Sequence, residues 1–244
     1  MKERGMIFNA EMVRALLDGR KTQTRRPIKW KQTRFTEIGE REDGSKWPWS
    51  EDAEHACDFW HPCPFGAVGE RIWVREAFRF PASLDDVSPT GVGEMAVATG
   101  YRKPWAPTFY EFTGTFSDGW KGFETPPKVS GAGKLRPSIH MPRWASRILL
   151  EITGVRVERL NAISPEDAES EGLERTNFTG FGDEPGLPSY PEPDVYFDPL
   201  KKQWKEYPPE AFAGLWESLY GEGSWQANPW VWVIEFKRVE GGVA

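Results

Sequence analysis

The sequence LLDGRKTQTRR, residues 16–26, decides how the N-terminal part of this chain folds. It ends a short amphipathic helix, because apolar side chains recur at helical spacing up to Leu17 and Asn9 is a suitable N-cap. Gly19 supplies the left-handed residue that stops such a helix. A lysine, two threonines and three arginines follow at once. This composition predicts a turn that holds an anion.

The chain has 244 residues and a formal net charge of −6, which fits one domain with a substantial core and excludes a globally basic nucleic-acid coat protein. It contains no apolar run long enough to span a bilayer and no signal segment at its start, so we expect a cytoplasmic protein that does not bind membranes. The sequence GAGK at 131–134 lacks the length and context of a nucleotide-binding loop, and we expect no cofactor.

Three long runs rich in β-branched and aromatic residues, 72–80, 148–160 and 230–239, predict strands. Two further helices are marked by their starts, Ser164-Pro165 and Pro208-Pro209. Between these elements lie three stretches without a clear period, which we interpret as loop insertions into one α+β domain. They comprise residues 28–65, 81–140 and 174–205.

Gly19, Lys21, Thr24 and Arg26 fit the signature Gly-x-Lys-x-x-(Glu or Thr)-x-Arg, and at this point the chain resembles the ASCH family. Segments similar to the family's other elements follow in the same order. They are residues 69–76, 148–160 followed by 163–172, and 230–236. The segment 137–147 is similar to the form found in bacteriophages and prophages. The resemblance implies a PUA-like β-barrel with short flanking helices and a nucleobase or RNA ligand.

Members of this family that hydrolyse the amide of N4-acetylcytidine carry a lysine, a threonine and a glutamate, which correspond here to Lys21, Thr24 and Glu171. The resemblance implies that Lys21, with a pKa lowered by desolvation or by Arg25 or Arg26, removes the proton of Thr24. Glu171 then orients the lysine or handles a proton at the leaving amine. The same residues also suit a purely structural turn with ordinary ion pairs.

A second interpretation is binding without catalysis. Two stretches, 20–34 and 134–147, are rich in Lys and Arg, and Trp30 and Trp144 within them offer stacking faces. This pattern predicts a single-stranded nucleic acid, RNA rather than DNA, or a nucleoside as partner, and it leaves a modified-base reader or a ribonuclease open. The expected binding residues are Arg25, Arg26, His140, Arg143 and Trp144.

Metal binding is the third interpretation. Two His-x-Cys pairs, His55 with Cys57 and His61 with Cys63, offer four zinc ligands. The spacing is not that of a standard zinc finger, and we expect no metal.

Overall fold

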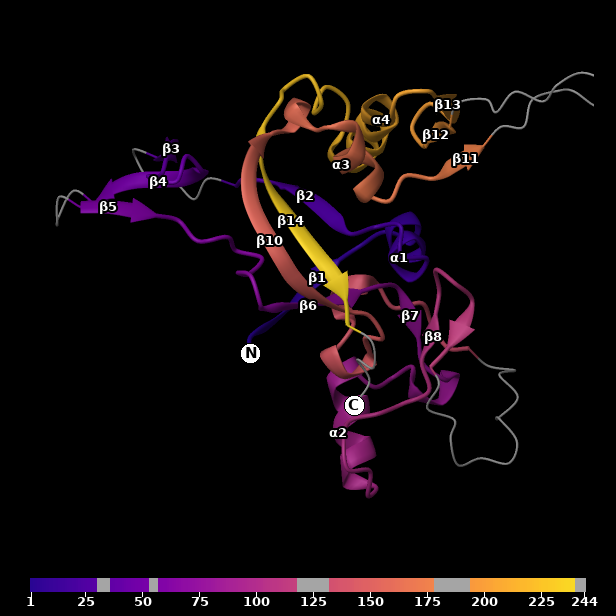
Figure 1. The fold of residues 1–244 in the computed structure, drawn as a ribbon. Coiled ribbons are helices and arrows are strands. Elements are labelled where there is room, and N and C mark those ends of the chain that lie inside the picture. Colours follow the sequence, from indigo (N-terminus) through magenta and orange to yellow (C-terminus); the bar gives the residue numbers. More distant parts are fainter. Residues whose placement is uncertain (30–35, 53–56, 118–131, 178–193, 240–244) are drawn as a thin grey trace, which may run out of the picture. The chain divides into compact units, whose positions relative to one another are not determined.

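The computed structural model describes residues 1–29, 36–52, 57–117, 132–177 and 194–239. The chain is a mixed α+β protein, as the sequence predicts, and its strands outnumber its helices. It divides into two compact units (Figure 1). The first unit comprises residues 1–17, 69–152 and 237–244, and the second comprises residues 18–68 and 153–236. One domain with insertions stays a prediction.

The first unit contains strands, helices and short 3-10 turns (η). They are β1 (Glu3–Ile7), α1 (Ala10–Leu17), β6 (Arg71–Arg75), β7 (Phe78–Arg79), η1 (Ala82–Leu84), α2 (Pro89–Ala98), β8 (Phe109–Tyr110), β9 (Thr115–Phe116), η3 (Ser138–His140) and η4 (Arg143–Ala145). Helix α1 begins where Asn9 Oδ1 accepts a hydrogen bond of 2.8 Å from the Met12 amide, which confirms the predicted cap.

The second unit contains the remaining elements, with β10 and β14 shared between the units. They are β2 (Gln23–Pro27), β3 (Thr36–Glu40), β4 (Lys46–Asp52), β5 (Cys57–Trp60), β10 (Leu149–Arg159), η5 (Leu160–Ala162), α3 (Pro165–Ser170), β11 (Arg175–Asn177), β12 (Asp194–Asp198), β13 (Gln203–Lys205), α4 (Pro208–Tyr220) and β14 (Trp230–Arg238). The predicted strands at 148–160 and 230–239 and the helices at 165 and 208 are confirmed.

The main sheet has five strands in the order β1-β6-β10-β14-β2. In the first unit β1 is parallel to β6, with Gly5 opposite Trp73, and β6 is antiparallel to the start of β10. In the second unit β14 is antiparallel to β2, with Ile234 opposite Thr24. The pairings between the described residues leave this sheet open rather than closed into a barrel.

Each unit has its own apolar core. In the first unit, Phe78, Phe80 and Leu149 belong to a cluster that also includes Trp73 and Met141. In the second unit the core lies between α3, α4 and β14. Its members include Leu160, Phe212, Leu215, Trp216 and Val233.

The interpretation of residues 28–65, 81–140 and 174–205 as loops is wrong in part. The first stretch forms the antiparallel sheet β3-β4-β5, the second carries α2, and the third carries β12 within a small sheet. A search for long runs with a hydrophobic period does not find short hairpin strands, because these strands are stabilised by their pairing register and by cross-strand packing. Helix α2 is rich in Gly and Ala, so its apolar period is weak, although Ser88 caps it with a hydrogen bond from the Gly91 amide.

Among the described residues, no helix has both the length and the apolar character that crossing a membrane requires.

Candidate functional site

Lys21 and Glu171 meet in the second unit although 150 residues separate them in the sequence. The Lys21 ammonium lies 2.7 Å from the Glu171 carbonyl oxygen and 2.8 Å from its carboxylate, and the two backbones form an isolated antiparallel β-bridge. Both side chains are buried, with exposed fractions of 0 % and 2 %. The two charges therefore face each other away from water.

Helix α3 places the Glu171 carboxylate. The Ser164 hydroxyl accepts a hydrogen bond of 3.1 Å from the Asp167 amide at the start of the helix, and Pro165 occupies its first turn. Glu171 is the C-cap residue, and Gly172 follows with φ of +89°. The sequence predicted this short helix, and its two ends fix the position of Glu171.

Strand β2 supplies a second cation. The Arg25 guanidinium lies 3.2 Å from Glu171, 2.7 Å from Asp167 and 3.2 Å from Glu158, and its side chain is fully buried. Its Cζ also lies 6.0 Å from the centre of the Phe212 ring on α4. Arg25 is thus held by three carboxylates and is not directed to solvent.

Arg156 on β10 extends the cluster. Its guanidinium lies 2.6 Å from Asp167 and 2.5 Å from Glu158, and it also pairs with Glu235. We call the whole group the ion network. It consists of Lys21, Arg25, Arg156, Glu158, Asp167, Glu171 and Glu235.

Burial and charge shift the pKa values within the ion network. Burial lowers the pKa of Lys21 below 10.5, against the opposing effect of Glu171, and the neighbouring Arg26 and Arg25 lower it further. Burial acts to raise the pKa of Asp167, but Arg25 and Arg156 hold it below the usual 3.8. A lysine with a lowered pKa is a candidate proton acceptor.

Two buried donors next to these charges have no hydrogen-bond acceptor among the described residues. They are Nε2 of Gln23 and Nε of Arg25. The Gln23 amide oxygen accepts a bond of 3.3 Å from Arg156, so its amide nitrogen faces elsewhere. Two unsatisfied donors on the same face of β2 fit a carbonyl or another acceptor atom of a ligand.

Thr24 lies on the other face of β2. It alternates with Gln23 and Arg25, whose side chains meet Arg156 and Glu171, and successive strand residues point to opposite faces. Thr24 is buried opposite Ile234 on β14. The structure thus brings Lys21 and Glu171 together and directs Thr24 away from them.

Arg26 and Tyr220 lie next to the ion network and are more exposed than Lys21 and Arg25. The two side chains share a hydrogen bond, and Tyr220 also interacts electrostatically with Glu171. Burial raises the pKa of the Tyr220 hydroxyl. Tyr220 is 37 % exposed, and its ring centre lies 4.2 Å from that of the tilted Trp216 ring.

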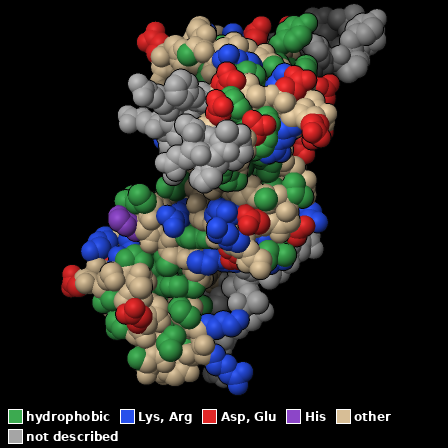
Figure 2. Space-filling view, turned by 90° about the vertical axis from the view of Figure 1, so that its left-hand side faces the viewer, with side chains coloured by type: hydrophobic (Ala, Val, Ile, Leu, Met, Phe, Trp, Pro, Cys, Tyr) green, Lys and Arg blue, Asp and Glu red, His purple; other side chains and the backbone are tan. Residues whose placement is uncertain are grey.

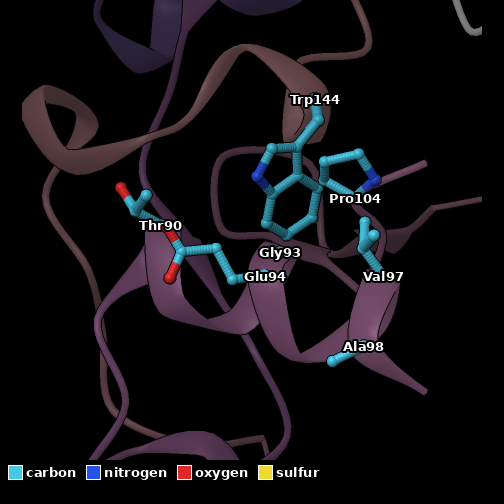
Figure 3. A pocket seen from close by; sticks show the side chains of 7 residues that line it. All are labelled: Thr90, Gly93, Glu94, Val97, Ala98, Pro104 and Trp144. Atoms are coloured by element: carbon cyan, nitrogen blue, oxygen red, sulfur yellow. The ribbon is translucent and has the colours of Figure 1, made fainter.

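The other three expected binding residues belong to the first unit. His140 is exposed at the end of η3, and the Arg143 guanidinium lies 2.5 Å from Glu3. Trp144 stacks on Phe80 with 5.5 Å between ring centres and lines a cavity (Figure 3). The expected site residues are therefore divided between the units.

The predicted anion-binding turn and the basic runs become mostly internal contacts. Residues 23–27 form β2 instead of a turn, because they pair with β14. Arg20 donates to the carbonyls of Gly172 and Leu173, and Arg136 is buried against the carbonyls of Leu84 and Val87. On the face shown in Figure 2, Lys and Arg side chains are interspersed with Asp and Glu side chains.

For the metal hypothesis, His55 and the Cys57 side chain lie outside the described residues. His61 forms a hydrogen bond of 2.9 Å with the Ser50 hydroxyl and packs edge-on against Phe59, and Cys63 is buried. Within the described part of the chain no group of three or more His, Cys, Asp or Glu residues is arranged to hold a metal ion.

Sequence reasoning missed Gln23, Arg156 and Asp167. Asp167 lies in the predicted acidic helix, and Arg156 alternates with apolar residues along β10, so each had a local signal. Their common meeting point depends on strand pairing, which the local pattern does not contain.

Comparisons with family models, curated proteins and solved structures find no match to this chain. The likeness to the ASCH family therefore rests on the motifs alone.

Proposed function

We propose that this protein binds a nucleobase, free or in single-stranded RNA, at the Lys21–Glu171 pair. The observation that carries the proposal is the 2.8 Å contact between these two buried side chains. The ASCH resemblance implies a role for both residues, and the contact is independent of that resemblance. We extend the proposal to a PUA-like arrangement of the main sheet and to a cytoplasmic setting.

The unsatisfied donors support a nucleobase ligand. Nε2 of Gln23 and Nε of Arg25 require an acceptor, and nucleobases carry carbonyl oxygens and ring nitrogens that accept hydrogen bonds. The exposed part of Tyr220 offers a ring on which a base can stack as it approaches. Entry to the pair requires side-chain movement, because Lys21 and Glu171 are closed off from solvent.

Amide hydrolysis is the second candidate function. The lowered pKa of Lys21 favours it, because a lysine with a lowered pKa loses its proton more readily and can then act as a base. The position of Thr24 on the other face of β2 counts against Thr24 as the nucleophile. The geometry therefore favours binding over a Lys–Thr hydrolytic mechanism.

One experiment tests both. Wild-type protein, Lys21→Met and Thr24→Val are titrated with N4-acetylcytidine and with a short RNA that contains it, and release of cytidine is followed by chromatography. We expect saturable binding without release, weakened at least about tenfold in Lys21→Met and retained in Thr24→Val. Circular dichroism verifies that each variant is folded.

Absence of binding to either ligand by folded wild-type protein refutes the proposal. Release of cytidine that disappears in both variants establishes hydrolysis through Lys21 and Thr24 instead. Steep weakening of RNA binding with salt, and salt-independent binding of the nucleoside, distinguish a nucleic-acid ligand from a free base.

A further inference from the structure

A cavity of about 430 Å³ lies in the first unit, against helix α2 (Figure 3). Its lining is mainly apolar, and it includes one residue with a hydroxyl and one with a carboxylate. The lining residues are Thr90, Gly93, Glu94, Val97, Ala98, Pro104 and Trp144. A volume of this size admits a nucleoside. The cavity shares no residue with the ion network.

Trp144 forms a fixed aromatic wall of the cavity. One face of its indole ring stacks on Phe80 with an angle of 6° between the planes. Gly93 lies so close that a Cβ there would be 2.8 Å from the indole nitrogen and 2.9 Å from Pro104. Only glycine at this position leaves the ring in place beside α2. The indole is therefore a preformed platform for a flat ligand.

Glu94 and Thr90 supply the polar groups. They lie one turn apart on α2, and in Figure 3 the carboxylate of Glu94 is next to Thr90, at one side of the indole ring. Both residues are exposed, and neither has an ion pair or a side-chain hydrogen bond within the described residues. Two adjacent carboxylate oxygens accept a pair of parallel N–H donors, and a hydroxyl next to them can donate to an acceptor.

The Watson–Crick edges of the bases differ in how they match this pattern. Guanine presents two adjacent donors, N1–H and the exocyclic amine, followed by the O6 acceptor. Adenine and cytosine place a ring acceptor beside their single amine, and uracil has one donor between two acceptors. A carboxylate repels these acceptors, since it has no proton to offer. Guanine alone satisfies Glu94 with both donors and Thr90 with O6.

We propose that this cavity binds a guanine base, stacked on Trp144 and held through its Watson–Crick edge by Glu94 and Thr90. None of the seven lining residues is cationic, so the base rather than a phosphate is recognised. The base belongs either to a free nucleoside or to an unpaired guanine in RNA, and both present the same edge.

The test is calorimetric titration of the full chain with guanosine, inosine, adenosine and cytidine, and with RNA hexamers that contain a single guanine or none. Inosine lacks only the exocyclic amine of guanine. We expect guanosine to bind at least about tenfold more tightly than inosine, because one hydrogen bond to a charged acceptor is lost, and adenosine and cytidine to bind more weakly still. Preference for the guanine hexamer over guanosine identifies RNA as the source of the base.

The variants locate the site. Glu94→Gln should weaken guanosine binding about tenfold and abolish the preference over inosine, and Thr90→Val should weaken both ligands equally. Glu11→Gln on α1 is the matched control, since Glu11 is also an exposed helical glutamate, and it should change nothing. Trp144→Leu should reduce all base binding, and its fold is verified by circular dichroism.

Equal binding of guanosine and inosine, absence of guanosine binding, or full affinity in Glu94→Gln overturns the proposal. The Lys21–Glu171 proposal is tested by binding of N4-acetylcytidine and this proposal by the difference between guanosine and inosine, so the failure of one is distinguishable from the failure of the other.

Discussion

Replacing Glu171 by Gln is the sharpest test of the ion network. Each of the two Glu171 carboxylate oxygens accepts from a different buried cation, Oε2 from Lys21 and Oε1 from Arg25. A glutamine has one acceptor and one donor group in the same volume, so in either orientation its amide nitrogen faces one of the two cations. Glu171→Gln therefore breaks one contact, makes it repulsive and removes the compensating charge.

The cost of this change follows from burial. Removing one partner of a buried ion pair costs about 3–5 kcal/mol, and Glu171 has a 2 % exposed side chain, so screening by water is slight. Arg25 keeps Asp167 and Glu158, which places the expected loss at the lower end, about 3 kcal/mol. For a chain of this size that corresponds to a decrease in Tm of roughly 6–12 °C.

Urea unfolding followed by tryptophan fluorescence measures the loss, with thermal unfolding as a second measurement. Glu210→Gln on α4 is the matched control, because this glutamate is exposed, and it should leave the midpoint unchanged. A loss below about 1 kcal/mol in Glu171→Gln, similar to that of a surface pair, would refute the buried network as described.

Three further predictions follow from individual contacts. Arg25 and Arg156 hold the pKa of the Asp167 carboxylate below 3.8, so this carboxylate stabilises the fold above that pH, and the stabilisation disappears as the pH falls through the lowered pKa. We therefore expect the free energy of unfolding, measured with urea from about pH 5 downwards, to depend less on pH in Asp167→Asn than in the wild type. Burial lowers the pKa of Lys21, so as the pH rises the folded state releases this proton before the unfolded state does. The free energy of unfolding should therefore increase with pH between the lowered pKa and 10.5, and Lys21→Met should lack this increase. Alanine is a better helix former than glycine by about 1 kcal/mol. Gly214→Ala should nevertheless destabilise α4, because the added Cβ would lie 1.9 Å from Asp198 Oδ1. Thermal unfolding compares this variant with Ala213→Gly, which loses helix propensity alone.

The parts of the fold that short-range chemistry determines were predictable from the sequence. The cap at Asn9, the stop at Gly19 and the start of α3 at Ser164 each depend on a residue and its neighbours within a few positions. Strands β10 and β14 were also found, because long runs of β-branched and aromatic residues mark them.

Strand β2 was not predictable in this way. Its sequence QTRRP is polar, and such a segment is typical of a loop. It becomes a strand because β14 pairs with it and because the carboxylates of α3 and β10 neutralise Arg25. Local sequence propensity includes neither the pairing with β14 nor the neutralisation of Arg25, since both depend on residues more than 130 positions away.

Dependence on distant residues also explains why the structure joins only two of the three expected catalytic residues. Lys21 and Glu171 were chosen through the family resemblance, and they lie in contact. Thr24 was chosen with them by sequence spacing, but a threonine three positions after Lys21 shares its face only if the backbone turns between them. The extended backbone of β2 places Thr24 on the opposite face from Gln23 and Arg25.

A buried ion network is a poor device for stability alone, because well-packed apolar side chains of similar volume often stabilise a protein as well or better. Replacing part of the ion network by apolar side chains therefore distinguishes a structural role of the network from a binding role. In the triple variant Lys21→Met, Arg25→Leu, Glu171→Leu, Asp167 and Glu158 still pair with Arg156, so no new buried charge is left alone. We expect the variant to unfold at a urea concentration at or above that of the wild type and to lose binding of N4-acetylcytidine and its RNA. A folded variant that keeps this binding assigns the network a purely structural role, and the ligand then contacts residues other than Lys21 and Glu171.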